Sequence, residues 1–340
     1  MKKVLTLLVV LAMIVPLAAC GSNGKQTLTV YNAGSYIDKT TISDFEKEYN
    51  CNVVYDEYNS PEDCYVKVAK SDTPYDVVCV CDYMIDRMIQ EGLLAKLDKS
   101  QIPNLSGISP DYLAPSYDPN NDYSVPYMVG TLGILYNKTM VSSTPTSWGC
   151  LWDPQYSGNI LMIDAMREAI GVTANLLGYS MSTDDDSQLA AIKQKLIDQK
   201  PLVQAYTADD TPDKMIAGEA ALSVYYSGEA YGAIQENPDL DYVIPEEGSS
   251  KWVDAWTVLK TSKEQTLANE FINFMSSTDI AVRNMTETGY TSAVSAAWAS
   301  FDDNPIMFPS SDVLSKCQTY SYSADATVKY NDLWTAVRSQ

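Results

Sequence analysis

The chain has 340 residues, a length typical of about two domains. Hydrophobic residues make up 46% of it and charged residues 20%, as in globular rather than disordered proteins. The 44 acidic and 23 basic residues give a formal net charge of -21, which argues against nucleic-acid binding and against charge-driven attachment to anionic membranes. No histidine is present, which excludes Ser-His-Asp triads, Cys-His dyads and zinc sites that contain histidine.

The N-terminus has the features of a targeting signal. Two lysines precede an apolar run over 4–17, which is too short to span a bilayer comfortably. The run ends in LAAC and is followed by GSNG, which resembles a bacterial lipobox with Cys20 as the acylated residue. A plain signal peptide or a short anchor is the alternative. We expect a lipoprotein signal peptide over 1–19, a lipidated linker over 20–26, and an extracytoplasmic protein anchored to the cell membrane.

The first hundred residues alternate between strand and helix patterns. Apolar or β-branched runs predict strands, and amphipathic spacing predicts helices. A mainly parallel sheet in an α/β fold is typical of this alternation. The predicted strands are 27–31, 52–55 and 76–81, and the predicted helices are 41–49, 62–71 and 83–94.

The rest of the chain continues as a second α/β block. The segment 252–260 reads as a strand that leaves one lobe and enters another. Ser262 and Gln265 have the spacing of a capping box before a helix that runs to about Met275. The other predicted strands are 132–136, 160–163, 221–226 and 242–244, and the other predicted helices are 167–177 and 187–199.

Two acidic clusters suggest metal binding only superficially. Asp184, Asp185 and Asp186 precede a predicted helix, where carboxylates stabilise the helix N-terminus. The segment 118–122 imitates the start of an EF-hand but lacks the required Gly and bidentate Glu, so we expect a surface turn. The six later cysteines are irregularly spaced, and we expect buried free thiols rather than disulfides or a zinc site.

Aromatic and acidic residues follow the predicted strands. In open α/β sheets, ligands bind outside the carboxyl ends of the strands. Arg167 is the only cation at these positions, so the pocket would suit an organic cation held by carboxylates and aromatic faces. The segments concerned are 32–36, 82–83, 164–168, 226–227 and 252–254.

Several long segments resemble one known family. The chain is similar to the spermidine/putrescine-binding proteins of bacterial ABC transporters, which are type II periplasmic binding proteins, over nearly all of the predicted mature chain. The segments that carry the resemblance are VYNAGSYID at 30–38, YDVVCVCDYMIDRMIQEGLL at 75–94, SVPYMVGTLGILYNK at 124–138, PTSWGCLWDPQYSGNILMIDAMREAIG at 145–171, YYSGEAY at 225–231, YVIPEEGSSKWVDAWTVLK at 242–260 and ETGYTSA at 287–293.

The resemblance implies an α/β clamshell of two lobes, each with a mainly parallel sheet flanked by helices. We expect lobe 1 at 27–130 plus 254–298, and lobe 2 at 131–253 plus 299–340. The ligand would lie between the lobes. The positions that match the family's ligand-binding motifs are Tyr36, Asp82, Tyr83, Glu168, Tyr226, Trp252, Asp254 and Tyr290.

Three positions depart from the family pattern. Ala33 replaces a common Trp, Ala165 replaces a frequent second acid, and Cys81 replaces the usual Ser. Counting Asp82, Glu168 and Asp254 as three carboxylates favours spermidine, with putrescine as the competitor. Other cargoes on the same fold (another organic cation, ferric iron or an amino acid) are alternatives, as is, less favourably, a surface glycosidase that uses Glu168 and Asp254.

The resemblance implies capture and delivery without chemistry. A monomer would close on the polyamine and dock on permease subunits of an ABC transporter, with no cofactor, metal or nucleic acid involved. The same clamshell could serve as a sensor without import.

Overall fold

The computed structural model describes residues 24–70, 74–301 and 303–339. The predicted signal peptide over 1–19 and the predicted lipidation residue Cys20 lie outside this part of the chain. No helix in the described part is long and apolar enough to cross a membrane.

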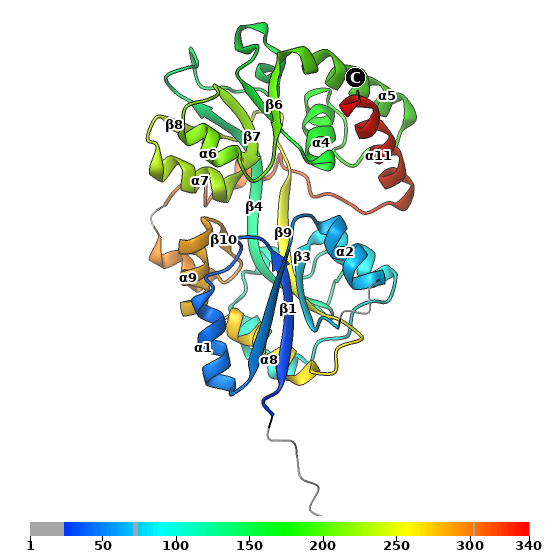
Figure 1. The fold of residues 1–340 in the computed structure, drawn as a ribbon, viewed down its shortest axis with the longest axis vertical. Helices are drawn as coiled ribbons and strands as arrows, with labels where there is room; N and C mark the ends of the chain where they lie inside the picture. The colour runs from blue at the N-terminus through cyan, green and yellow to red at the C-terminus, as the bar shows by residue number, and fades with distance from the viewer. Residues whose placement is uncertain (1–23, 71–73, 302, 340) are drawn as a thin grey trace, which may run out of the picture.

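A ten-stranded sheet is the frame of the molecule. Its strands are β1 (Thr27–Ala33), β2 (Asn52–Tyr58), β3 (Val77–Cys81), β4 (Ser124–Asn137), β5 (Ile160–Ile163), β6 (Val203–Thr207), β7 (Leu222–Tyr226), β8 (Leu240–Val243), β9 (Lys251–Val258) and β10 (Thr291–Ser292). The order is β2-β1-β3-β9-β4-β7-β5-β6, and β8 and β10 also pair with β4. Figure 1 shows β4 and β9 running side by side through the waist between two lobes.

Eleven α-helices in the described residues surround this frame. They are α1 (Thr40–Tyr49), α2 (Pro61–Lys70), α3 (Asp82–Gln90), α4 (Met166–Leu176), α5 (Asp186–Gln199), α6 (Thr211–Ile216), α7 (Ser227–Glu236), α8 (Gln265–Met275), α9 (Thr278–Thr288), α10 (Ser311–Leu314) and α11 (Ala324–Arg338). Short 3-10 helices are η1 (Lys99–Gln101), η2 (Pro103–Gly107), η3 (Pro110–Tyr112), η4 (Trp148–Trp152), η5 (Pro154–Tyr156), η6 (Lys200–Leu202) and η7 (Ser295–Ser300).

The fold class is confirmed as a two-lobed α/β clamshell. We call the half with β1–β3 the first lobe and the half with β5–β8 the second lobe (Figure 1). Parallel pairing joins β1 to β2 and β3, and β5 to β6 and β7. The two strands that cross the waist are antiparallel to their neighbours, because β9 pairs in this sense with β3 and β4. Each lobe is therefore a parallel unit closed by antiparallel crossing strands.

Separate apolar cores stabilise the two lobes. In the first lobe, Phe45 of α1 meets Phe271 of α8 with ring centroids 5.1 Å apart, and Trp256 of β9 packs on Phe271 at 5.5 Å. In the second lobe, α11 packs on α4 and α5 through buried Tyr330 and Ile170. The C-terminal helix therefore belongs to the second lobe, as Figure 1 also shows.

Two local predictions need revision. The strand predicted over 132–136 is the end of the longer β4, because the chain continues unbroken from one lobe to the other. The predicted capping box is wrong: Glu264, not Ser262, is the N-cap of α8. The Ser262 hydroxyl instead donates to Asp76 at 2.6 Å. Asp76 is buried, and buried carboxylates are nearly always hydrogen-bonded.

The acidic clusters and cysteines have structural surroundings. Asp185 is the N-cap of α5 and accepts from the backbone N–H groups of Ser187 and Gln188, as predicted. The segment 118–122 is a turn with Pro119 and Asn120 exposed, as predicted. Asp118 itself is buried, because its carboxylate accepts several backbone N–H bonds from the following residues. The six cysteines of the described residues are free thiols.

Candidate functional site

The crossing strand β9 presents two of the predicted residues to one face. Side chains two apart in a strand share a face, so Trp252 and Asp254 lie together there. Gly130 of β4 lies opposite Trp252, and a Cβ at Gly130 would lie 2.3 Å from the indole. Only glycine lets the indole pack directly on the neighbouring strand.

An aromatic corner surrounds this face. Ring centroids of Tyr36 and Tyr290 are 5.5 Å apart, and those of Trp252 and Tyr290 are 5.0 Å apart. The Tyr127 hydroxyl donates to the Tyr36 carbonyl at 2.9 Å and so helps to fix the position of Tyr36 in the corner. Tyr36 and Tyr290 are buried, so their rings are fixed walls rather than mobile surface groups.

Three carboxylates reach the same region. Burial raises the pKa of Asp254 to about 7, the Tyr36 hydroxyl opposes this rise, and the charge of Glu229 adds to it. Burial also raises the pKa of Glu229 to about 7, although the Tyr290 hydroxyl donates to its carboxylate. Burial raises the pKa of Glu168, which the hydroxyl of Tyr226 partly offsets. A nearby positive charge would lower the pKa of each of these carboxyl groups and stabilise its ionised form.

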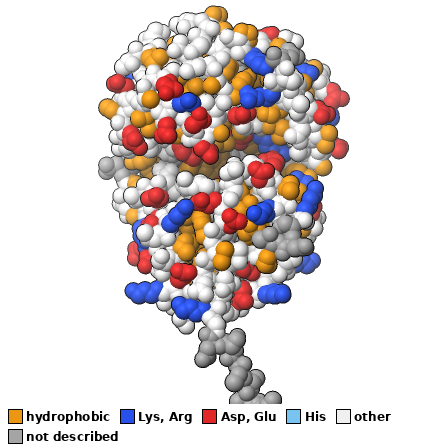
Figure 2. Space-filling view, viewed as in Figure 1, with side chains coloured by type: hydrophobic (Ala, Val, Ile, Leu, Met, Phe, Trp, Pro, Cys, Tyr) orange, Lys and Arg blue, Asp and Glu red, His pale blue; other side chains and the backbone are white. Residues whose placement is uncertain are grey.

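Arg167 connects the lobes at the edge of this region. Its Nε lies 3.5 Å from Oε1 of Glu62 on α2, and its guanidinium lies 4.2 Å from the centre of the Tyr83 ring. The Tyr83 hydroxyl donates to the same Glu62 oxygen at 3.2 Å. A cation, a carboxylate and an aromatic ring therefore join α4 of the second lobe to α2 and α3 of the first. Figure 2 shows acidic side chains beside the hollow between the lobes.

The predicted residues do not all gather at one place. Tyr36, Trp252, Asp254 and Tyr290 form the corner, while Tyr226 and Glu168 lie on the second lobe. Tyr83 packs under Arg167.

Asp82 differs, because it lines a cavity whose walls also include Val253 and Lys251 of β9. Tyr36, Asp254 and Tyr290 do not line this cavity, so it is separate from the aromatic corner. Trp252 is the one other predicted residue that lines it.

Sequence reasoning missed two residues of the site. Glu229 lies in the first turn of α7, three positions after β7 ends, just beyond the segment singled out at that strand end. Tyr320 is buried, faces the Tyr83 ring at 6.4 Å and donates to the Arg167 carbonyl at 3.1 Å. No strand end precedes Tyr320, so only the tertiary structure brings it to the site.

The arrangement suits one kind of ligand. Three carboxylates lie among aromatic faces, and Arg167, the cation that the described residues place beside Glu168, is already engaged by Glu62. Such a site binds a positively charged group through charge-assisted hydrogen bonds and cation–π contacts, and its rings pack against methylene groups. The described residues contain no His, Cys, Asp and Glu grouping that could hold a metal ion.

Comparison with known proteins agrees with this chemistry. Residues 40–309 match the model of a family described as bacterial extracellular solute-binding protein. The spermidine/putrescine-binding periplasmic protein of Salmonella typhimurium is 30% identical over 334 residues, covering 96% of each chain.

Solved structures give the same result. The spermidine/putrescine ABC transporter substrate-binding protein PotD of Streptococcus pneumoniae superposes with a TM-score of 0.82 at 35% identity, covering 93% of this chain and 99% of the other. The TpPotD lipoprotein of Treponema pallidum superposes with a TM-score of 0.85 at 28% identity, covering 93% and 100%. The Salmonella and Streptococcus relatives are substrate-binding proteins and not enzymes, and the latter serves an ABC transporter. The chain belongs to the bacterial extracellular solute-binding proteins.

Proposed function

We propose that this protein captures a polyamine, spermidine or putrescine, between its lobes and delivers it to the permease of an ABC transporter. The observation that carries the proposal is that buried Asp254 and Glu229 lie at the aromatic corner, while buried Glu168 lies beside Tyr226 of the second lobe. A polyamine has ammonium groups for the carboxylates and methylene segments for the rings. The names of the similar proteins support the same ligand class.

Each predicted residue except Asp82 has a role in the proposal. Asp254 and the Tyr36 hydroxyl hold one ammonium group, and Trp252 packs on the methylene chain. Glu168, with Tyr226, holds the opposite end from the second lobe. Tyr290 positions Glu229 through their hydrogen bond. Tyr83 acts through Arg167, since their stacking brings the lobes together.

Spermidine remains the preferred ligand, on a revised count of carboxylates. The sequence count used Asp82 as the third acid, but that side chain lines the cavity behind the crossing strands. Glu229 takes its place in the proposed site, so three carboxylates still match three ammonium groups. The third charge of spermidine would be neutralised there.

The remaining parts of the proposal concern the whole protein. We assign lobe 1 to 27–130 plus 254–298 and lobe 2 to 131–253 plus 299–340, with a monomer as the working unit. Lipidation at Cys20 would hold the monomer at the membrane beside its permease. Closure on the polyamine would be driven by contacts that both lobes make with it.

Calorimetric titration tests the ligand. The purified protein is unfolded and refolded to remove bound ligand, and then titrated with spermidine, putrescine, cadaverine, arginine and ferric citrate. Asp254→Asn should weaken spermidine binding by about 10- to 150-fold, which corresponds to about 1.5–3 kcal/mol for a charge-assisted hydrogen bond. Exposed Asp239→Asn is the matched control. Binding of another cargo, or no effect of Asp254→Asn, would overturn the proposed site.

A further inference from the structure

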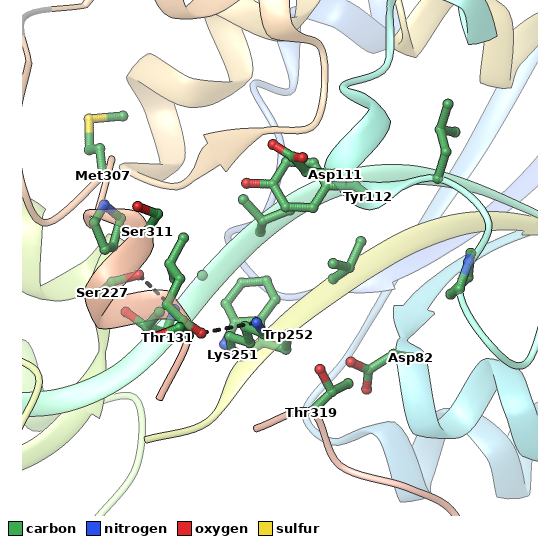
Figure 3. Close-up of a pocket in the computed structure, with 18 of the residues that line it drawn as sticks. Asp82, Asp111, Tyr112, Thr131, Ser227, Lys251, Trp252, Met307, Ser311 and Thr319 are labelled. Carbon is green, nitrogen blue, oxygen red and sulfur yellow. Dashed lines mark hydrogen bonds between the residues drawn. The ribbon is translucent and has the colours of Figure 1, made fainter. Parts of the chain in front are cut away.

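A second cavity lies behind the waist of the molecule. It has a volume of about 530 Å³ and is bordered by β4, β9 and the segment 306–319. These are the stretches of chain that run between the lobes at this side (Figure 1). Figure 3 shows Asp82 and Thr319 on one side of the cavity, with Trp252 and Lys251 at its floor.

Asp82 gives this cavity a specific chemistry. The side chain is 2% exposed, and its Oδ1 accepts from the backbone N–H of Tyr83 at 2.6 Å. No geometric hydrogen bond reaches its buried Oδ2, although the nearby Val253 backbone N–H and the charge of Arg167 hold the pKa of Asp82 below the value that burial alone would give. The indole N–H of Trp252 is likewise buried without a partner. Buried polar atoms of folded proteins are nearly always paired, because leaving one unpaired costs about 1–3 kcal/mol.

The other walls restrict what could satisfy Asp82. Tyr112, Tyr117, Leu113 and Met307 make much of the lining apolar or aromatic. The one cation of the lining, Lys251, donates its Nζ to the Leu314 carbonyl at 3.0 Å, so it is already engaged. A compact organic ammonium ion with an apolar body fits a carboxylate at one end and aromatic walls along the rest.

We propose that this cavity is a second ligand site, which binds a small organic ammonium ion through Asp82 and thereby modulates closure of the lobes. The cavity changes shape when the lobes rotate, because its walls are the connections about which they turn. Trp252 also belongs to the aromatic corner, so one side chain borders both sites. If the ammonium ion in the cavity binds the open or the closed form of the protein more tightly, it will change the affinity of the cleft for the polyamine.

The direct test uses 2-phenylethylammonium as the probe, titrated calorimetrically into the full protein. Asp82→Asn should weaken binding of the probe at least about tenfold. The Asn amide oxygen can still accept from the Tyr83 backbone N–H, but the side chain carries no negative charge. Ser315→Trp, at the exposed rim of the cavity, should block the probe to a similar extent. Glu168→Gln, in the cleft, should leave probe binding within about twofold, because Glu168 is not among the groups that shift the pKa of Asp82. Melting temperatures confirm that each variant folds.

Three results would overturn the second site: no binding of the probe to the unmodified protein, unchanged binding by both cavity variants, or loss of binding on Glu168→Gln. The last would place the probe in the cleft. A crystal of the complex should show the probe's nitrogen beside Asp82 Oδ2.

The modulatory part rests on the proposed polyamine function and has its own test. Spermidine is titrated with and without saturating probe, and its dissociation constant should change at least about threefold. By reciprocity, spermidine should change the affinity of the probe by the same factor. An unchanged constant would refute modulation. If spermidine does not bind at all, the polyamine proposal fails, while the probe titrations still decide whether the cavity is a site.

Discussion

At the residue scale, Glu229 is the group whose importance only the structure reveals. Its carboxylate accepts from the Tyr290 hydroxyl, and its charge raises the pKa of Asp254. Two carboxylates that repel one another within a buried region need a shared cation to be ionised together. Glu229 therefore contributes to binding only if the ligand carries positive charge.

Glu229→Gln should weaken spermidine binding by about 10- to 150-fold, because the substitution removes one charge-assisted contact and keeps the side-chain shape. The effect on putrescine should be smaller, since two ammonium groups can be held by Asp254 and Glu168. Calorimetric titration of both ligands measures the difference. Glu236→Gln, exposed near the end of the same helix, is the control. Equal losses for both polyamines would contradict the charge count.

Local sequence could predict part of the site and not the rest. Trp252 and Asp254 share a face because they are two apart in a strand, which is a local property. Asp82 directly follows a strand, and its direction depends on how that strand pairs. Cys81 lies opposite Asp254 in the sheet, so the next residue turns to the other face. The pairing partner is 173 positions away in the sequence, and no local pattern specifies it.

At the element scale, α2 and α4 are joined across the lobes by Glu62 and Arg167. The Glu62 side chain is 42% exposed, so solvent screens the pair and its contribution to closure is small. The contact does not involve the aromatic corner, and the charges of Glu62 and Arg167 act on the pKa of Glu168 in opposite directions. It should therefore add to the affinity for every ligand that closes the lobes, without distinguishing between them.

Glu62→Gln should weaken spermidine and putrescine binding by the same factor, about two- to fivefold, because an exposed ion pair contributes up to about 1 kcal/mol. Titration of both ligands gives the two factors. Glu57→Gln removes the exposed ion pair with Lys39 within the first lobe and should leave both affinities unchanged. A change in the ratio of the two affinities would show that Glu62 contacts the ligand.

The helices also show where sequence rules succeed and fail. The α5 cap at Asp185 follows from the sequence, because capping depends on the few residues beside it. The capping box at Ser262 fails, although its spacing is correct, because α8 begins only at Gln265. The Ser262 hydroxyl accepts from the backbone N–H of Glu264 and donates to Asp76, which directly precedes β3. The spacing alone does not specify where a helix begins.

At the scale of the whole molecule, pH should affect stability through two groups of carboxyls. Burial raises the pKa of Asp82 to about 8 and those of Asp254 and Glu229 to about 7. These groups hold protons in the folded state that the unfolded chain has already released above about pH 4. Hydrogen bonds to neighbouring groups lower the pKa values of Asp98 and Asp122. These two groups therefore change the stability only at pH values at or below the ordinary pKa range of Asp.

The free energy of unfolding of the ligand-free protein should therefore fall as pH rises from about 5 to about 8. Spermidine should reverse this trend if its ammonium groups stabilise the ionised carboxylates. Thermal melting across this range, with and without spermidine, measures both effects. The double variant Asp254→Asn, Glu229→Gln should have a weaker pH dependence. A ligand-free protein that becomes more stable towards pH 8 would contradict the direction given for these pKa values.

The sequence by itself determined the α/β class, most strands and helices, and the aromatic and acidic character of the site. These follow from hydrophobic periodicity and from residue types at strand ends, which are local properties. The tertiary structure decided which carboxylates share the cleft, since Glu229 enters it and Asp82 lines the cavity behind the crossing strands. That choice depends on pairing between β3, β9 and β4, whose residues meet only when distant parts of the chain form one sheet.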